Sequence, residues 1–83
     1  MAIPWRNLRT IKAREIISAL IHDGFELRTQ AGSHQRYRHP DGRRATVTFH
    51  SPGQTFRIDV LQSMIRDQAQ WTEEDLKRLG LLK

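Results

Sequence analysis

The chain has 83 residues, no cysteine, a hydrophobic fraction of 37% and a formal net charge of +5. This length allows one domain with a modest core, and the lack of cysteine excludes disulfides and thiolate metal sites. No apolar run is long enough for a signal peptide or a membrane-spanning helix. The composition therefore predicts a soluble cytoplasmic protein with no membrane partner.

The positive charge is unevenly distributed along the chain. Residues 1–50 contain nine Lys or Arg against four Asp or Glu, whereas residues 51–83 contain five of each. A concentrated positive surface is typical of proteins that bind polyanions, because neutralised phosphates release their counterions. Charge alone is equally compatible with a basic surface that has no partner.

An apolar stripe at helical spacing predicts the first helix over residues 13–24. Gly24 ends it, and Thr10 is the candidate N-cap. The stripe consists of Ile16, Ile17, Leu20 and Ile21.

Alternation of apolar and polar residues then predicts three strands, over residues 25–30, 34–39 and 45–49. Short turns at 31–33 and 40–42 make them an antiparallel meander. One face of this sheet is expected to be apolar and to carry Phe25, Leu27, Tyr37, Val47 and Phe49. Thr29 is assigned to that face, and Glu26, Arg28 and Gln30 to the other.

The second half of the chain predicts a loop over 50–56 and two further helices. Asp59 is the expected N-cap of the first, with Gln62 three residues on. Thr72 and Asp75 form a capping box for the second, over about 72–80, with Trp71 packing against Leu76. The order is α-β-β-β-α plus a short C-terminal helix, in one α+β domain over 1–83 with its core at about 12–67 and a lead at 1–11. Both main helices must cover the apolar sheet face, so the other face stays open.

The open face is the candidate functional surface. By alternation it presents His34, Arg36, Arg38, Thr46 and Thr48, together with Arg28. Histidine transfers protons near neutral pH, because its ordinary pKa is about 6.5. RNA carries its own nucleophile, the 2′-OH, so a histidine beside phosphate-binding arginines is enough for cleavage without metal. Gly32 and Ser33, just before His34, give the tight turn and leave room for a ligand.

A metal site is the competing interpretation of the histidines. It would combine His34, His39, His50 and Asp41, but alternation places His34 and His39 on opposite faces of the sheet. We therefore expect no metal and no cofactor. Two other functions remain open: an RNA-binding module that never cleaves, and a protein-interaction domain whose basic surface meets an acidic partner.

The stretch "AREIISALIHDGFELRTQAGSHQRYRHPDGRRATVTFH", followed by "VLQSMIRD", resembles the HicA family of toxins from toxin–antitoxin systems. The matching motifs lie in the order and spacing of the family, over residues 13–67. They are Arg14-Glu15-Ile16, Asp23-Gly24-Phe25, Gly32-Ser33-His34, His39-Pro40 and Val47-Thr48. The resemblance implies a fold like that of double-stranded-RNA-binding domains. It also implies a metal-independent endoribonuclease that cleaves mRNA with His34 as the catalytic residue, and a HicB-type antitoxin that covers the His34 face.

Overall fold

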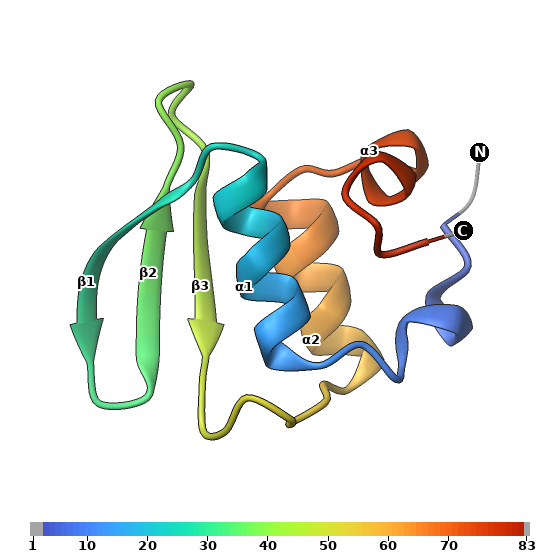
Figure 1. Ribbon diagram of the computed structural model, residues 1–83, viewed down its shortest axis with the longest axis horizontal. Coiled ribbons are helices and arrows are strands. Elements are labelled where there is room, and N and C mark those ends of the chain that lie inside the picture. The colour runs from blue at the N-terminus through green and yellow to red at the C-terminus, as the bar shows by residue number, and fades with distance from the viewer. Residues whose placement is uncertain (1–2, 83) are drawn as a thin grey trace.

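The three strands form one antiparallel sheet in the order β1-β2-β3, with the helices gathered beside β3 (Figure 1). This architecture comes from a computed structural model that describes residues 3–82. Its elements are η1 (Trp5–Leu8), α1 (Ala13–His22), β1 (Glu26–Ala31), β2 (His34–Arg38), β3 (Arg44–Thr48), α2 (Ile58–Gln62), η2 (Ser63–Gln68) and α3 (Glu73–Arg78). The predicted α+β class and element order are confirmed. Within residues 3–82, no helix is long and apolar enough to cross a bilayer.

The core lies between one face of the sheet and the helices. Tyr37, Ala45 and Val47 are buried from β2 and β3, and their strand neighbours Arg36 and Arg38 are exposed. The helical side of the core consists of Ile16, Ala19 and Leu20 from α1 with Leu61, Met64 and Ile65 from α2 and η2. Burial thus alternates along β2 and β3 as expected for a sheet covered on one face only.

The first strand departs from the predicted alternation. The register of β1 against β2 shifts between Leu27 and Thr29, which marks a β-bulge at Arg28. Thr29 therefore pairs with Arg36 on the open face, and Gln30 pairs with Gln35 on the helix face. Both assignments made from strict alternation were wrong, because one extra residue in a strand reverses the faces of all that follow.

The apolar face is also less completely covered than we predicted. Leu27 is 49% exposed, because β1 is the outer strand and lies farthest from α2 and α3 (Figure 1). Phe49 follows the end of β3 and is half-buried against a groove on α1 rather than under the sheet. Phe25, Tyr37 and Val47 are buried as expected.

Helix α1 begins without the predicted N-cap. Thr10 lies in a turn after η1, and the capping position is Lys12, whose backbone N–H donates to Oε1 of Glu15. The next two N–H groups, of Ala13 and Arg14, donate to backbone carbonyls of the 50–56 loop at 2.8 and 3.1 Å. The helix start is therefore satisfied by tertiary contacts, which a local motif does not reveal.

The second helix begins earlier than predicted and ends in a widened turn. Its capping position is Arg57, and Asp59 lies inside the first turn, where Oδ1 accepts from the N–H of Val60. Over Ser63–Gln68 the backbone becomes a π-helix, so that the N–H of Ala69 donates to the carbonyl of Met64. Gln68, at its end, accepts from the N–H of Thr46 at 2.8 Å and so caps the outer edge of β3.

The N-terminal lead and the C-terminal segment, as far as the structure describes them, both pack on the domain. Leu8 and Ile11 of the N-terminal lead belong to the buried core. At the other end the predicted capping box of α3 is confirmed: Oγ1 of Thr72 accepts from the N–H of Asp75, and Asp75 accepts from the N–H of Thr72. Trp71 and Leu76 are both buried, so the C-terminal segment also contributes to the hydrophobic core.

Candidate functional site

The open face of the sheet is built by the pairing of β2 with β3. The directly opposed residues on this face are His34 with Thr48, Arg36 with Thr46, and Arg38 with Arg44. The N–H of Phe49 donates to the carbonyl of Ser33 at 2.7 Å. Ser33 and Phe49 therefore form a hydrogen-bonded pair. Hydrogen-bonded and non-hydrogen-bonded pairs alternate along antiparallel strands, so the three opposed pairs on the open face are non-hydrogen-bonded pairs, in which side chains lie closest together.

His34 begins β2 immediately after a two-residue turn. Ala31 pairs with His34, so the turn consists of Gly32 and Ser33. Gly32 has φ +59°, and a Cβ there would meet no heavy atom within 4 Å, so conformation and not crowding favours glycine. Ser33 holds the turn against the end of β3 through its carbonyl. Within residues 3–82, exposed His34 makes no side-chain hydrogen bond and no ion pair, which leaves both ring nitrogens open to a ligand.

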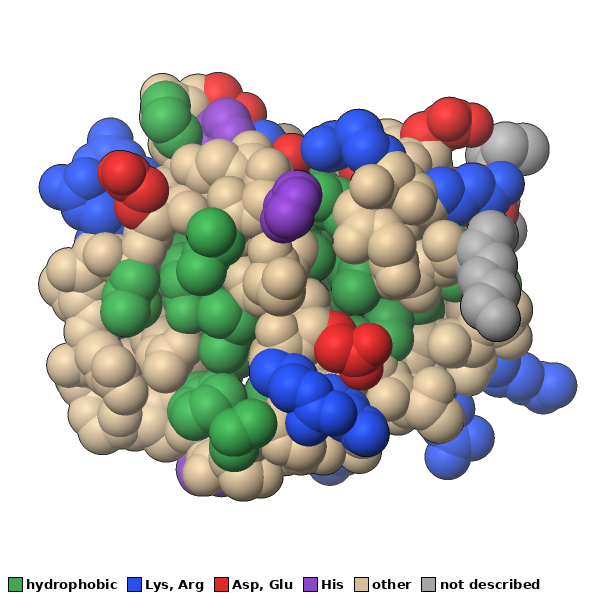
Figure 2. Space-filling view, viewed as in Figure 1, with side chains coloured by type: hydrophobic (Ala, Val, Ile, Leu, Met, Phe, Trp, Pro, Cys, Tyr) green, Lys and Arg blue, Asp and Glu red, His purple; other side chains and the backbone are tan. Residues whose placement is uncertain are grey.

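The arginines of the open face gather at the other end of the sheet. Arg28, Arg36, Arg38 and Arg44 line one shallow depression of about 440 Å³. Its other lining residues are Thr29, Tyr37, Ala45 and Thr46, and His34 is not among them. Figure 2 shows Lys and Arg side chains gathered beside β1, near the end of the sheet where β2 ends. The bulge thus brings Arg28 to the surface on which we expected it.

Arg44 is the member of this group that the sequence analysis missed. It lies opposite Arg38 and precedes Thr46 and Thr48 at strand spacing, so the same alternation that selected those two threonines applies to it. Only the strand boundary was wrong: β3 begins at Arg44 and not at Ala45.

Arg43, the neighbour of Arg44, has a structural role. Its guanidinium bonds Oδ2 of Asp41 at 2.8 Å, lies 3.2 Å from Oδ2 of Asp23 and donates to the carbonyl of Ala69 at 2.6 Å. It also lies 5.0 Å from the centroid of the Phe25 ring. These contacts hold the β2–β3 turn against α1, so Arg43 is not available to a ligand.

Asp23 organises this end of the domain. Its carboxylate accepts from the indole of Trp71 and from Arg78, each at 2.8 Å, and its carbonyl bonds Nε2 of His39 at 2.7 Å. Burial acts to raise the pKa of Asp23, but the bonds from Trp71 and Arg78 and the nearby guanidinium charges outweigh burial and lower it. The network fixes the chain entering β1.

Neither His39 nor Tyr37 is arranged to act on the open face. His39 uses Nε2 on Asp23 and accepts at Nδ1 from the N–H of Asp41, and its ring packs edge-on against Phe25 at 5.1 Å. Tyr37 is buried and donates its hydroxyl to Gln35, and burial raises its pKa. In the described part of the chain no group of three His, Cys, Asp or Glu side chains lies close enough to hold a metal ion.

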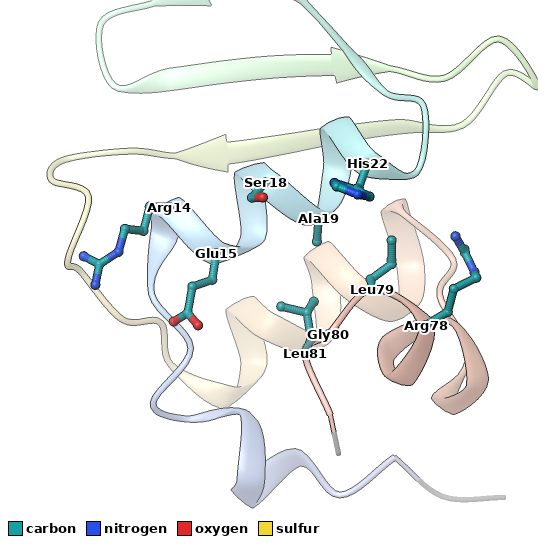
Figure 3. A pocket seen from close by; sticks show the side chains of 9 residues that line it. All are labelled: Arg14, Glu15, Ser18, Ala19, His22, Arg78, Leu79, Gly80 and Leu81. Carbon is teal, nitrogen blue, oxygen red and sulfur yellow. The ribbon is translucent and has the colours of Figure 1, made fainter.

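A second depression, of about 500 Å³, lies between α1 and the end of α3, away from the open face of the sheet (Figure 3). Arg14, Glu15, Ser18 and His22 line it from α1, and Arg78, Leu79 and Leu81 line it from the C-terminal segment. Arg14 and Arg78 lie at opposite ends of the view and Glu15 extends from α1 between them, so the charged groups do not converge on one point (Figure 3).

Comparison with known proteins agrees with the motifs in the chain. A family model described as the HicA toxin of bacterial toxin–antitoxin systems matches residues 13–71, well over half of the sequence. No curated protein matches the chain. The matched region contains α1, the whole sheet, α2, η2 and Trp71. The chain therefore belongs to the HicA toxin family and is the toxin component of a toxin–antitoxin pair.

Proposed function

We propose that this toxin is a metal-independent endoribonuclease in which His34 transfers protons at the cleaved phosphate of mRNA. The observation that carries the proposal is an exposed imidazole, which has no hydrogen-bond or ion-pair partner among residues 3–82, on the same sheet face as four arginines. A histidine held in the fold for structural reasons is usually engaged, as His39 is. Because mRNA is the substrate, the cytoplasm is the proposed place of action.

The chemistry requires only groups that RNA and this face supply. The 2′-OH attacks the adjacent phosphorus, the bond to the 5′-oxygen breaks, and the products are a 2′,3′-cyclic phosphate and a 5′-hydroxyl. His34 would take the proton of the 2′-OH or deliver one to the leaving oxygen. Arg36 lies on the same face two residues along β2, about 7 Å away, and is the nearest cation in that strand to steady the phosphate.

The other proposed RNA-binding residues act around this centre. Gly32 and Ser33 set the turn that presents His34, and the open space at Gly32 leaves room for the sugar-phosphate chain. Arg28 and Arg38 bind backbone phosphates farther along the face.

The decisive experiment compares wild-type protein with His34→Ala on a long single-stranded RNA in the presence of EDTA. Wild type should cleave and leave cyclic-phosphate ends, and His34→Ala should lose cleavage by at least a hundredfold while keeping its affinity for RNA. His22→Ala removes an exposed histidine on α1 and is the matched control, with cleavage unchanged. If neither wild type nor variant cleaves but both bind RNA, the protein is a non-catalytic RNA-binding module.

The family assignment includes an antitoxin partner, and we place a HicB-type antitoxin over the His34 face. The charge of this face favours an acidic partner segment, since complementary potentials steer association. Modification of His34 by an imidazole reagent such as diethyl pyrocarbonate should be suppressed in the complex, with His22 in the same sample as reference. Equal modification of His34 in free and bound toxin would show that the antitoxin binds elsewhere.

A further inference from the structure

The four arginines of the depression form a surface that the fold itself does not need. Arg38 and Arg44 are directly opposed on β2 and β3, in a pair where side chains start close together. Like charges in that position destabilise a sheet. Arg36 and Arg28 add two more positive charges to the same depression.

Little in the chain compensates this charge. Within residues 3–82, Arg36, Arg38 and Arg44 take part in no ion pair. Exposed Glu26 is directly opposed to Arg38 and makes a long ion pair of 3.9 Å with Arg28, which offsets only part of the four positive charges. Arg43, one residue away from Arg44, contacts the carboxylates of both Asp23 and Asp41. Arg43 thus stabilises the fold, whereas the arginines of the depression remain available to a ligand.

The end of the depression at Arg38 and Arg44 is separate from the proposed cleavage centre, whereas Arg36 lies between the two places. His34 does not line it, and Arg38 lies four residues farther along β2, about 13 Å away at the ordinary rise of a strand. One phosphate group cannot contact both places. An anion held by Arg38 and Arg44 therefore belongs to a different nucleotide from the one that His34 would cleave.

The chemistry of the face indicates recognition of backbone and not of bases. Phe25, Tyr37 and Trp71 are buried, and Trp5 and Phe56 pack against the core. Phe49 faces the groove on α1. Among the described residues no Phe, Tyr or Trp ring is thus left on the open face, so binding beyond His34 depends chiefly on charge.

We infer that Arg38 and Arg44, with Arg28, form a distal phosphate subsite that holds the RNA backbone at least one nucleotide away from the cleaved bond. This inference rests on the proposed function of the open face, and it adds Arg44 to the residues involved. The subsite makes binding grow with the length of the RNA and fall steeply with salt, with little preference among bases.

The test measures binding of 2′-O-methyl oligonucleotides, which lack the attacking hydroxyl, at increasing length from the dinucleotide upward. Arg44→Gln should weaken binding of long oligomers by about tenfold, the size expected for one charge-assisted contact. The plot of log affinity against log salt should become shallower by about 0.7. The ratio of wild-type to variant affinity should rise with length. Arg9→Gln, the same charge change beside η1 on the far side of the helices from the sheet, is the control (Figure 1).

Each outcome has a definite meaning. An Arg44→Gln variant that matches wild type at every length overturns the subsite, and if wild type still cleaves RNA the proposed function stands. An equal loss at every length, the dinucleotide included, places Arg44 in the cleavage centre instead. Failure of wild type to bind any oligomer overturns both proposals. The melting temperature of Arg44→Gln should equal or exceed that of wild type, because a repulsive pair is removed; a clear decrease would assign Arg44 to the fold.

Discussion

The indole N–H of Trp71 donates to Oδ2 of Asp23 at 2.8 Å, which joins the end of α1 to the segment before α3 across 48 positions of the chain. Arg78 reaches Oδ1 of the same carboxylate, and Arg43 approaches Oδ2 from the β2–β3 turn. One half-buried aspartate thus links three segments that are remote in sequence. It also fixes Gly24 and Phe25, where the chain turns from α1 into the sheet that carries His34.

Replacing this carboxylate should destabilise the domain. We expect Asp23→Asn to lower the free energy of unfolding by about 2–3 kcal/mol, because two guanidinium groups lose their shared anion. Thermal or urea unfolding measures the change. Asp67→Asn is the control. Asp67 is exposed and, in the described part of the chain, its side chain bonds only its neighbour Arg66, so the substitution should change stability little. Equal effects of the two substitutions would contradict the role of Asp23.

The same residue predicts how stability depends on pH. The pKa of Asp23 is lowered in the folded state, and so is that of Asp75, chiefly through the N–H of Thr72. Below the ordinary aspartate pKa of about 3.9 the unfolded chain binds more protons than the folded chain. The stabilisation by these two aspartates is therefore fully present above that pH, and it is lost as the pH falls toward their lower pKa values in the folded state. The urea midpoint should therefore decrease between neutral pH and pH values below about 4. Asp23→Asn should flatten that decrease, and an unchanged slope in the variant would contradict the assignment.

Two glycines with the same backbone conformation should respond differently to alanine. Gly24 and Gly42 have φ of +103° and +100°, so alanine strains both. At Gly42 a Cβ meets no atom within 4 Å, whereas at Gly24 it would lie 2.9 Å from Nε2 of His39. That ring cannot move freely, because it bonds Asp23 and Asp41.

We therefore expect Gly42→Ala to cost about 1–2 kcal/mol of stability and Gly24→Ala to cost at least 1 kcal/mol more. Unfolding in urea, with both variants measured side by side, gives the difference. A double variant with His39→Ala should recover part of the extra loss at Gly24. Identical losses for the two glycines would show that His39 yields without cost.

Local patterns in the sequence determined most of the elements and the position of His34. Helix α1 follows from its apolar stripe, the α3 cap from Thr72 and Asp75, and the turn before β2 from Gly32 and Ser33. These signals are short-range, and in these places they agree with the packed fold. Alternation along β2 placed His34 and Arg36 on the open face, because that strand contains no irregularity.

Other features were decided by contacts between distant segments. The bulge at Arg28 reversed the faces of Thr29 and Gln30, and loop carbonyls replaced Thr10 at the start of α1. Arg43 and Arg44 are adjacent and chemically identical, yet one is bound by Asp23 and the other lies open. The sequence shows which residues are charged but not which of them form ion pairs, because ion pairing depends on distances that only the packed fold sets.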